Sequence, residues 1–158
     1  MKLTGGFPAW RSGPEHLIWG VPIFYECDRC TACCRWPGQV RLSEVEIARL
    51  AACKGLSEHD FIQQFTRLRP DRQGLTLLEK PNGECVFLVG DDCSVQSVKP
   101  QQCRDFPNLW NFPDFQKVCH AIPRLVGEAE YQRRIAAATG RENVAANAPD
   151  LLPATPPV

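Results

Sequence analysis

Two successive stretches of the chain place apolar residues at the three- and four-residue spacing of an amphipathic helix. The first helix begins at Ser43, where Ser-Glu-Val-Glu fits a capping box, and Gly55 is suited to end it. The second begins at Ser57 and is closed by Pro70. The apolar stripe of the first helix consists of Leu42, Val45, Ile47, Ala48, Leu50 and Ala51. The buried face of the second consists of Phe61, Ile62, Phe65 and Leu68.

Alternation of apolar and polar residues predicts strands elsewhere. Residues Val21–Tyr25 alternate in this way and predict a short strand or an extended lead-in. The segments Leu75–Lys80 and Glu84–Val89 flank Pro-Asn-Gly, and Asn-Gly tolerates the positive φ angles of a tight turn. We therefore expect a β-hairpin here, followed by a second turn at Gly90–Asp92.

Two further helices complete the pattern. Pro100 fits the first turn of a short helix that carries Cys103 and ends at Pro107. A longer helix is expected over Glu128–Thr139, ended by Gly140. Short helices combined with a hairpin predict a small α+β domain.

The distribution of glycine and proline defines the expected domain organisation. Residues 1–20 are rich in Gly, Pro and Trp and predict an irregular N-terminal arm, and residues 21–140 then form one domain. Residues 141–158 contain repeated prolines and predict a flexible, disordered tail.

Composition and charge exclude several classes of function. Lys plus Arg and Asp plus Glu both total 18, so no basic excess favours nucleic acid as a partner. No apolar run has the length of a signal peptide or of a membrane span. We therefore expect a protein of the reducing cytoplasm that does not bind a membrane. Stable disulfides are disfavoured there, and the odd number of nine cysteines also fits disulfide pairing poorly.

Four cysteines lie within eight residues, at Cys27, Cys30, Cys33 and Cys34. Thiolates at two-residue spacing can converge on one soft metal, an arrangement that zinc sites and iron–sulfur centres both use. Setting Cys53 aside leaves eight thiols, which suit two four-thiolate sites or one site with spare core cysteines. The other four candidate ligands are Cys85, Cys93, Cys103 and Cys119.

Several well-known cysteine motifs do not match. A bacterial ferredoxin motif requires its last cysteine where this chain has Pro37. A radical SAM motif requires wider spacing between its first cysteines, and a zinc ribbon requires a second Cys-x-x-Cys. The side chains of adjacent Cys33 and Cys34 diverge, so each can ligate a different metal, or one can ligate while the other packs.

Other residues near the cysteines have alternative interpretations. Cys53 is expected to be a small buried side chain of the first helix. His120 is a possible ligand, although a surface or supporting position is favoured. Arg104 with Asp105 either tunes the thiolates or forms a surface ion pair, and both alternatives remain open. The expected hydrophobic shell of the cysteines consists of Trp36, Phe106 and Trp110.

These blocks resemble the YkgJ-type cysteine-cluster family, a zinc- or iron-chelating domain with the hallmark Cys-x-x-Cys-x-x-Cys-Cys. The hallmark is matched by residues 27–34. The second block of the family is matched by Cys85-Val-Phe-Leu, by Cys93 and by Pro100-Gln-Gln-Cys-Arg-Asp-Phe-Pro107. The resemblance covers about residues 25–120. A similar domain occurs in a flagellin lysine N-methylase, so the resemblance also leaves a methyl-transfer role open.

The resulting expectation is a metalloprotein whose eight cysteines hold an iron–sulfur cluster of the 4Fe–4S type. The compact first block, the surplus of thiolates and the absence of paired zinc-ribbon knuckles favour this cluster over zinc, and the expected role is redox or electron transfer. The alternatives are a zinc-binding structural or adaptor module and an enzyme related to methyl transfer. The sequence assigns no catalytic residue and no protein partner.

Overall fold

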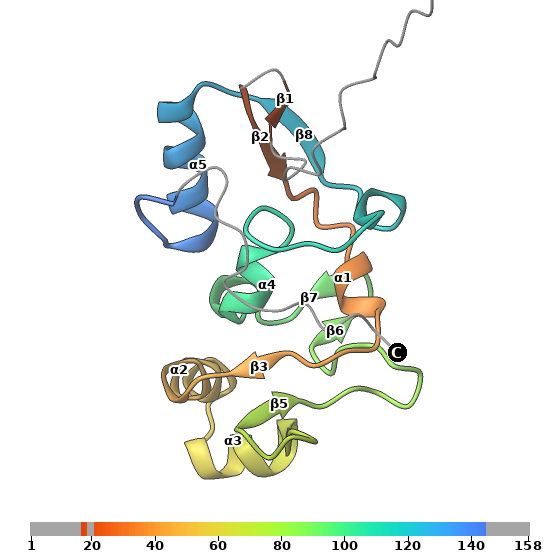
Figure 1. Cartoon of the computed structure of the whole chain (residues 1–158). Coiled ribbons are helices and arrows are strands. Elements are labelled where there is room, and N and C mark those ends of the chain that lie inside the picture. The colour runs from red at the N-terminus through yellow and green to blue at the C-terminus, as the bar shows by residue number, and fades with distance from the viewer. Residues whose placement is uncertain (1–16, 19–20, 145–158) are drawn as a thin grey trace, which may run out of the picture.

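The computed structural model describes residues 17–18 and 21–144. Figure 1 shows a sheet with helix α5 at the top, helices α1 and α4 in the middle, and helices α2 and α3 with a second sheet at the bottom. The helices are α1 (Ala32–Arg35), α2 (Glu44–Lys54), α3 (Glu58–Phe65), α4 (Gln101–Asp105), α5 (Glu128–Thr139) and the 3-10 helices η1 (Gln96–Val98) and η2 (Phe115–Lys117). The strands are β1 (Leu17–Ile18), β2 (Val21–Glu26), β3 (Arg41–Leu42), β4 (Thr66–Leu68), β5 (Leu75–Leu77), β6 (Leu88–Val89), β7 (Asp92–Cys93) and β8 (Ile122–Leu125). These elements confirm the expected small α+β architecture.

Strand β2 organises the upper part of the molecule. It lies between β1 and β8 in an antiparallel sheet, with Ile23 opposite Leu125. Helix α5 packs against β2, with the bounds and the Gly140 cap that the sequence predicted. The buried side chains between them are Phe24, Leu109, Tyr131, Ile135 and Val144.

Asn108 ties β2 to the segment that follows α4. Its side-chain oxygen accepts a hydrogen bond from the Tyr25 amide at 2.8 Å, and its side-chain nitrogen donates to the Tyr25 carbonyl at 2.9 Å. The side chain thus acts as a short strand partner for Tyr25. Because Cys27 follows β2 directly, this contact fixes where the first cysteine block begins.

Helix α2 begins as the sequence predicts. The Ser43 hydroxyl accepts from the Glu46 amide and the Glu46 carboxylate accepts from the Ser43 amide, which completes the capping box. Gly55 ends the helix with a left-handed φ of 67°. Of its predicted apolar stripe, Ile47, Leu50 and Ala51 are buried, whereas Val45 is 62% exposed. The core therefore uses one side of the predicted stripe.

The second predicted helix is shorter than expected. It begins after Ser57, whose side chain caps the Asp60 amide, but it ends at Phe65 rather than at Pro70. Residues Thr66–Leu68 instead form β4, which pairs with β5. Leu68 was expected on the buried face and is 52% exposed. Pairing with the next strand along the chain replaces the last helical turn.

The predicted hairpin is present only around its turn. Gly83 has φ 86° and its amide bonds the Lys80 carbonyl at 2.8 Å, but the following ladder contains only the bridge between Glu79 and Cys85. Strand β5 pairs with β3 and β4. The second turn joins β6 to β7, as expected at residues 90–92.

The ends of the described chain extend the domain beyond its expected bounds. Leu17–Ile18, placed in the irregular arm by the sequence, pair with β2. Arg141 and Val144, placed in the flexible tail, pack on the domain. The rest of the expected arm and tail, residues 1–16, 19–20 and 145–158, lies outside the described residues. Within the described part of the chain, no helix has the length and apolar character needed to cross a membrane.

Candidate metal centre

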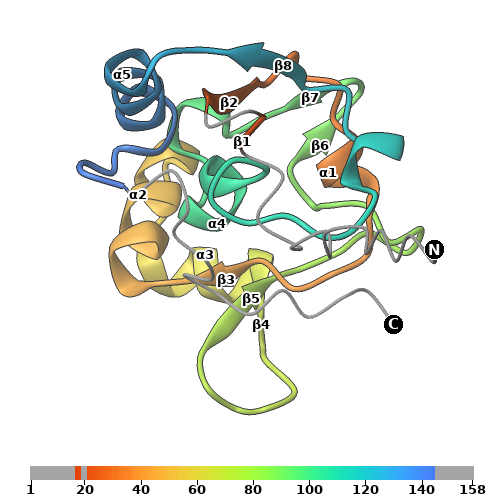
Figure 2. The same ribbon diagram turned by 45° about the horizontal axis from the view of Figure 1, so that its top comes forward.

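Eight of the nine cysteines line a single cavity of about 60 Å³. These are the eight candidate ligands of the sequence, brought together from segments up to 92 residues apart: Cys27, Cys30, Cys33, Cys34, Cys85, Cys93, Cys103 and Cys119. Figure 2 shows the elements that carry them gathered around α4, with α1 and β6 on one side. Their role as ligands stays a prediction, but the cavity gives it a common location.

The first cysteine block turns sharply to bring its sulfurs to the cavity. Arg29 and Thr31 have left-handed φ angles of 60° and 61°, which non-glycine residues rarely adopt. Asp28 supports the bend, because its carboxylate accepts a 3.0 Å hydrogen bond from the Cys30 amide. Residues in such sparsely populated conformations persist where the surrounding structure over-determines them, often at ligand sites.

Four thiols form one mutually interacting group, consisting of Cys33, Cys34, Cys85 and Cys93. Each pair among the four is linked by a thiol hydrogen bond or by an electrostatic effect of one thiol on the other. Hydrogen bonding with the Cys34 thiol lowers the pKa of Cys33 to about 7 and that of Cys93 to about 6. The same hydrogen bonds, first with Cys33, raise the pKa of Cys34, and burial raises the pKa of Cys85. A proton on Cys34 thus stabilises two neighbouring thiolates.

The other four cysteines adjoin this group. Burial raises the pKa of Cys103, and the Cys33 thiolate adds to the effect. Burial also raises the pKa of Cys119 to about 11, with Cys30 the first of its thiolate neighbours. The His120 amide lies 3.5 Å from the Cys30 sulfur, while the side chain of His120 is exposed. His120 therefore contacts the site through its backbone, in the surface position that the sequence favoured.

Backbone amides point at several of the sulfurs. The Arg29 amide lies 3.4 Å from the Cys27 sulfur. Cys85, Cys93 and Cys119 likewise accept a backbone hydrogen bond from the residue two positions later, and in each case it lowers the thiol pKa. Such donors stabilise a thiolate over a thiol, and in iron–sulfur proteins they tune the reduction potential.

Two basic residues, Arg29 and Lys99, line the cavity, and Lys99 acts on several of the thiols. The Lys99 ammonium lowers the pKa of Cys33, Cys93 and Cys103, after the larger effects of hydrogen bonding or burial. The sequence reasoning did not assign Lys99 a role. Its only signal was a basic residue beside Pro100 in the second cysteine block.

The sulfurs fit a metal by chemistry but do not converge on one point. Among the described residues, no three or more His, Cys, Asp or Glu side chains are placed so that they can hold a metal ion. Protonated thiols bond to one another, as Cys34 does to Cys33 and Cys93, instead of surrounding a common centre. Thiol ligands lose their protons when metal binds, so binding here requires both deprotonation and movement of the sulfurs. The donor set itself, soft thiolates near amide donors and a cation, suits zinc and iron–sulfur centres.

Of the three aromatic residues expected around the cysteines, Phe106 lines the cavity itself. It packs on Trp110 with 4.9 Å between ring centroids. Trp36 contacts both Phe106 and Phe112, the latter at 4.7 Å. Trp36 and Trp110 therefore adjoin the cavity through Phe106 rather than lining it.

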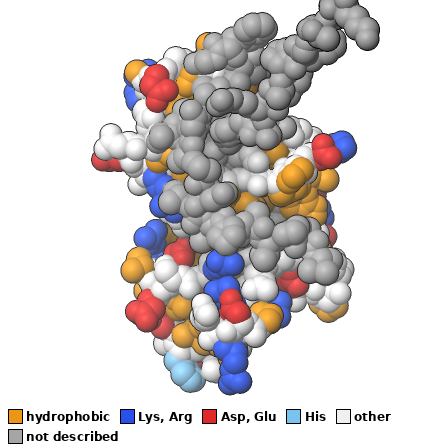
Figure 3. Space-filling model, viewed as in Figure 1, with side chains coloured by type: hydrophobic (Ala, Val, Ile, Leu, Met, Phe, Trp, Pro, Cys, Tyr) orange, Lys and Arg blue, Asp and Glu red, His pale blue; other side chains and the backbone are white. Residues whose placement is uncertain are grey.

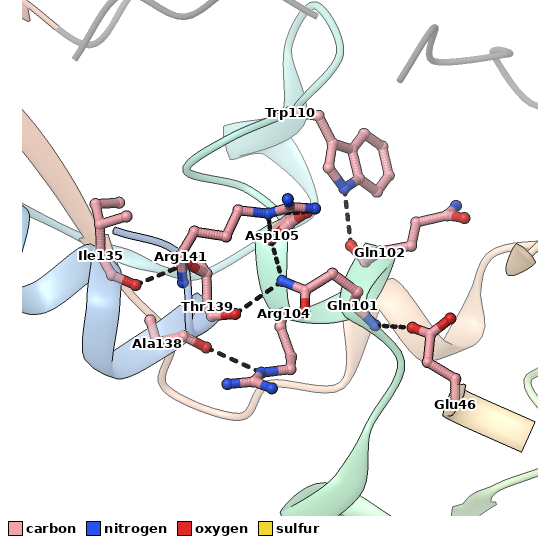
Figure 4. Close-up of polar contacts among 10 residues, drawn as sticks. All are labelled: Glu46, Gln101, Gln102, Arg104, Asp105, Trp110, Ile135, Ala138, Thr139 and Arg141. Carbon is pink, nitrogen blue, oxygen red and sulfur yellow. Dashed lines mark hydrogen bonds and ion pairs between the residues drawn. The ribbon is translucent and has the colours of Figure 1, made fainter. Parts of the chain in front are cut away.

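Arg104 and Asp105 match neither of their expected roles. Figure 4 shows both side chains directed toward the C-terminal end of α5. Arg104 Nε donates to the Ala138 carbonyl at 3.4 Å, and Asp105, only 2% exposed, binds Arg141 at 2.8 Å. The pair therefore holds α4, which carries Cys103, against α5.

Gln101 extends this network from α4 to α2. Its side-chain nitrogen donates to Asp105 at 2.6 Å and to the Thr139 carbonyl at 2.8 Å. Its backbone amide donates to the Glu46 carboxylate. Helix α4 is thereby bonded to both neighbouring helices (Figure 4).

The prediction for Cys53 was wrong. Cys53 lies on α2, is exposed and does not line the cavity. The buried stripe of α2 passes through Leu50 and Ala51 and leaves Cys53 on the outer side. Cys53 therefore differs from the other eight cysteines in both location and surroundings.

Comparison with curated proteins and with solved structures gives no match. A family model, by contrast, matches residues 26–120, which include all eight cysteines of the cavity. It is the CxxCxxCC family, described as a putative zinc- or iron-chelating domain. The match spans more than half of the chain and supports metal binding. The protein therefore belongs to the CxxCxxCC family of zinc- or iron-chelating domains.

Proposed function

We infer that the cysteine cavity holds an iron–sulfur cluster, of the 4Fe–4S type, and that the protein serves in redox or electron transfer. The observation that carries this proposal is that eight thiols line one cavity and that backbone amides are directed at several of the sulfurs, as in iron–sulfur proteins. A bound cluster supplies a redox centre whose potential depends on charge, hydrogen bonding to sulfur and solvent exposure.

The group of Cys33, Cys34, Cys85 and Cys93 is the first candidate for a complete four-thiolate ligand set. Two of its members already favour the thiolate form. Lys99 offsets part of the negative charge that deprotonation of the others adds. The remaining four thiols can hold part of a second centre or exchange with the first set.

The surroundings support a redox role. Amide donors to the sulfurs stabilise negative charge on them, and the Trp36–Phe106–Phe112 cluster keeps one side of the cavity apolar. Cys27 and Cys33 are exposed, so the centre lies near the surface, where an electron-transfer partner can approach.

A zinc site is the second candidate. Four neighbouring thiols match the Cys₄ set of structural zinc sites.

Anaerobic purification after expression with ample iron and zinc separates the two. An iron–sulfur cluster predicts visible absorbance that bleaches on reduction, an electron paramagnetic resonance signal in one redox state, and matched iron and sulfide. Zinc alone, with no visible absorbance, would overturn the iron–sulfur proposal. Cys34→Ser is expected to lower the metal content, whereas Cys53→Ser, a cysteine outside the cavity, is expected to leave it unchanged.

A further inference from the structure

The two cysteine blocks of the sequence are joined directly beside their sulfurs. The Cys85 amide donates a 2.7 Å hydrogen bond to the Cys34 carbonyl. These residues lie 51 positions apart, so the bond sets the first block against the second. It does not involve either sulfur and leaves both free to ligate.

Arg35 adds a side-chain bridge at the same place. It follows Cys34, and its Nη1 donates to Glu84, the residue before Cys85, at 3.0 Å. Its Nη2 donates to Asp91, two residues before Cys93, at 2.6 Å. One guanidinium thus spans the backbone segments that carry Cys34, Cys85 and Cys93.

Arg29 makes a similar contact from the Cys27–Cys30 turn. Its Nη2 binds the carboxylate of Asp92, the residue directly before Cys93. Each arginine therefore pairs with an acidic residue adjacent to a cysteine of the other block. Without these cations, the three carboxylates Glu84, Asp91 and Asp92 stand unneutralised beside a group of thiolates.

Exposure indicates what this bridge contributes. The Arg35 side chain is 40% exposed and that of Asp91 is 96% exposed. Ion pairs so accessible to water contribute little to folding stability. These ion pairs instead fix the position of one cysteine block relative to the other and neutralise carboxylates next to the sulfurs.

We propose that Arg35 is a positioning residue that holds Cys34 in register with Cys85 and Cys93, and so sets the metal affinity of the four-thiol group. The Arg29–Asp92 pair is a second tie between the same blocks. The proposal rests on metal binding at the cysteine cavity but does not depend on which metal binds. Residues that orient metal ligands typically change affinity 10–100-fold when they are removed.

The test compares Arg35→Gln, Arg35→Lys and wild type, with Arg133→Gln as the matched control on an exposed ion pair of α5 far from the cysteines. Binding of Zn²⁺ alone is measured in competition with a chromophoric chelator under reducing conditions. Arg35→Gln is expected to lower affinity roughly 10-fold with an unchanged urea midpoint. Arg35→Lys is expected to be intermediate, because one ammonium cannot span both carboxylates as a guanidinium does.

Amide hydrogen exchange of the metal-free protein provides an independent readout. Arg35→Gln is expected to speed exchange at Cys85, whose amide bonds Cys34, and not at Leu77, whose amide bonds Val40. The double variant Glu84→Gln/Asp91→Asn removes the same bridge from its other side and is expected to have the same effects.

Two outcomes are decisive and distinguishable. If Arg35→Gln binds Zn²⁺ as wild type does and the Cys85 amide is unaffected, the positioning role is wrong. If wild type binds neither Zn²⁺ nor iron, the proposed function fails, whereas the exchange of the Cys85 amide still decides whether Arg35 joins the blocks.

Discussion

Asp105→Asn removes the charge that holds α4 to the end of α5 while keeping the side chain almost the same size. In the structure, Asp105 accepts from Arg141 Nη2 at 2.8 Å, from Arg141 Nε at 3.1 and 3.2 Å, and from Gln101 at 2.6 Å. An asparagine retains one acceptor oxygen, which can keep the bond from Gln101. Its amide nitrogen is a donor and meets the donors of Arg141.

The magnitude follows from the bonds lost. A hydrogen bond to a charged group contributes about 1.5–3 kcal/mol. The variant loses the two-pronged contact with Arg141, and because the Arg141 side chain is 36% exposed, water replaces part of it. We therefore expect the free energy of unfolding to fall by about 2–3 kcal/mol, less than the 3–5 kcal/mol for breaking a fully buried pair.

Urea unfolding of the metal-free, reduced protein measures this loss. With a slope of about 1.5 kcal/mol per molar urea, the midpoint is expected to fall by roughly 1.3–2 M. Asp114→Asn makes the same chemical change in an exposed pair with Lys117 and is expected to shift stability by less than about 0.5 kcal/mol. Equal urea midpoints for Asp105→Asn and Asp114→Asn would show that the contact between Asp105 and Arg141 does not stabilise the fold.

The remaining predictions concern the thiols and one helix cap. In the metal-free protein, iodoacetamide should modify exposed Cys33 with a half-maximal rate near its pKa of about 7, because the Cys34 hydrogen bond stabilises the thiolate that reacts. Cys119, with its pKa raised to about 11, should stay unreactive near pH 7. Mass spectrometry of the modified peptides measures the reaction of both cysteines. A Cys33 rate that keeps rising beyond pH 9 would contradict the lowered pKa of Cys33. Ser43→Ala removes the hydroxyl that caps the Glu46 amide, and thermal unfolding should show a loss of about 1 kcal/mol, whereas an unchanged midpoint would show that the cap is unimportant.

The sequence predicted best those elements that local chemistry defines. Helix α5 has the predicted bounds, because Gly140 adopts the left-handed conformation that ends it. Helix α2 begins where the Ser43 capping box requires and ends at Gly55. Both signals lie within a few residues of the helix end they determine.

Predictions failed where contacts other than the helical pattern decide the outcome. The apolar pattern through Leu68 fits a helix, yet residues 66–68 pair with β5, the next strand along the chain. Cys53 and Val45 lie on an apolar side of α2 that the fold leaves exposed, because the core is placed against Ile47 and Leu50 instead. In the first case strand pairing, and in the second case core packing, chose between alternatives that the sequence left equally suitable.

The candidate site shows the same division. The positions of the cysteines predicted which eight thiols gather. Cys53 was set apart because it lies in the first predicted helix, away from the two cysteine blocks. These positions did not predict the cations Arg35 and Lys99 or the buried Asp105–Arg141 pair, because these depend on which segments lie side by side. Figure 3 shows basic and acidic side chains interspersed over α2, β3 and α3 on the face seen in Figure 1. Charge alone therefore marks no described residue of this face as part of a site.

Native mass spectrometry of the anaerobically isolated protein determines which metal centre the cysteine cavity holds. We expect a bound mass equal to four irons and four sulfides, lost together on acidification, with the cavity cysteines protected from alkylation and Cys53 modified. A mass excess of zinc alone would retain the metal site and reject the cluster. A chain with no bound mass would contradict metal binding at this cavity.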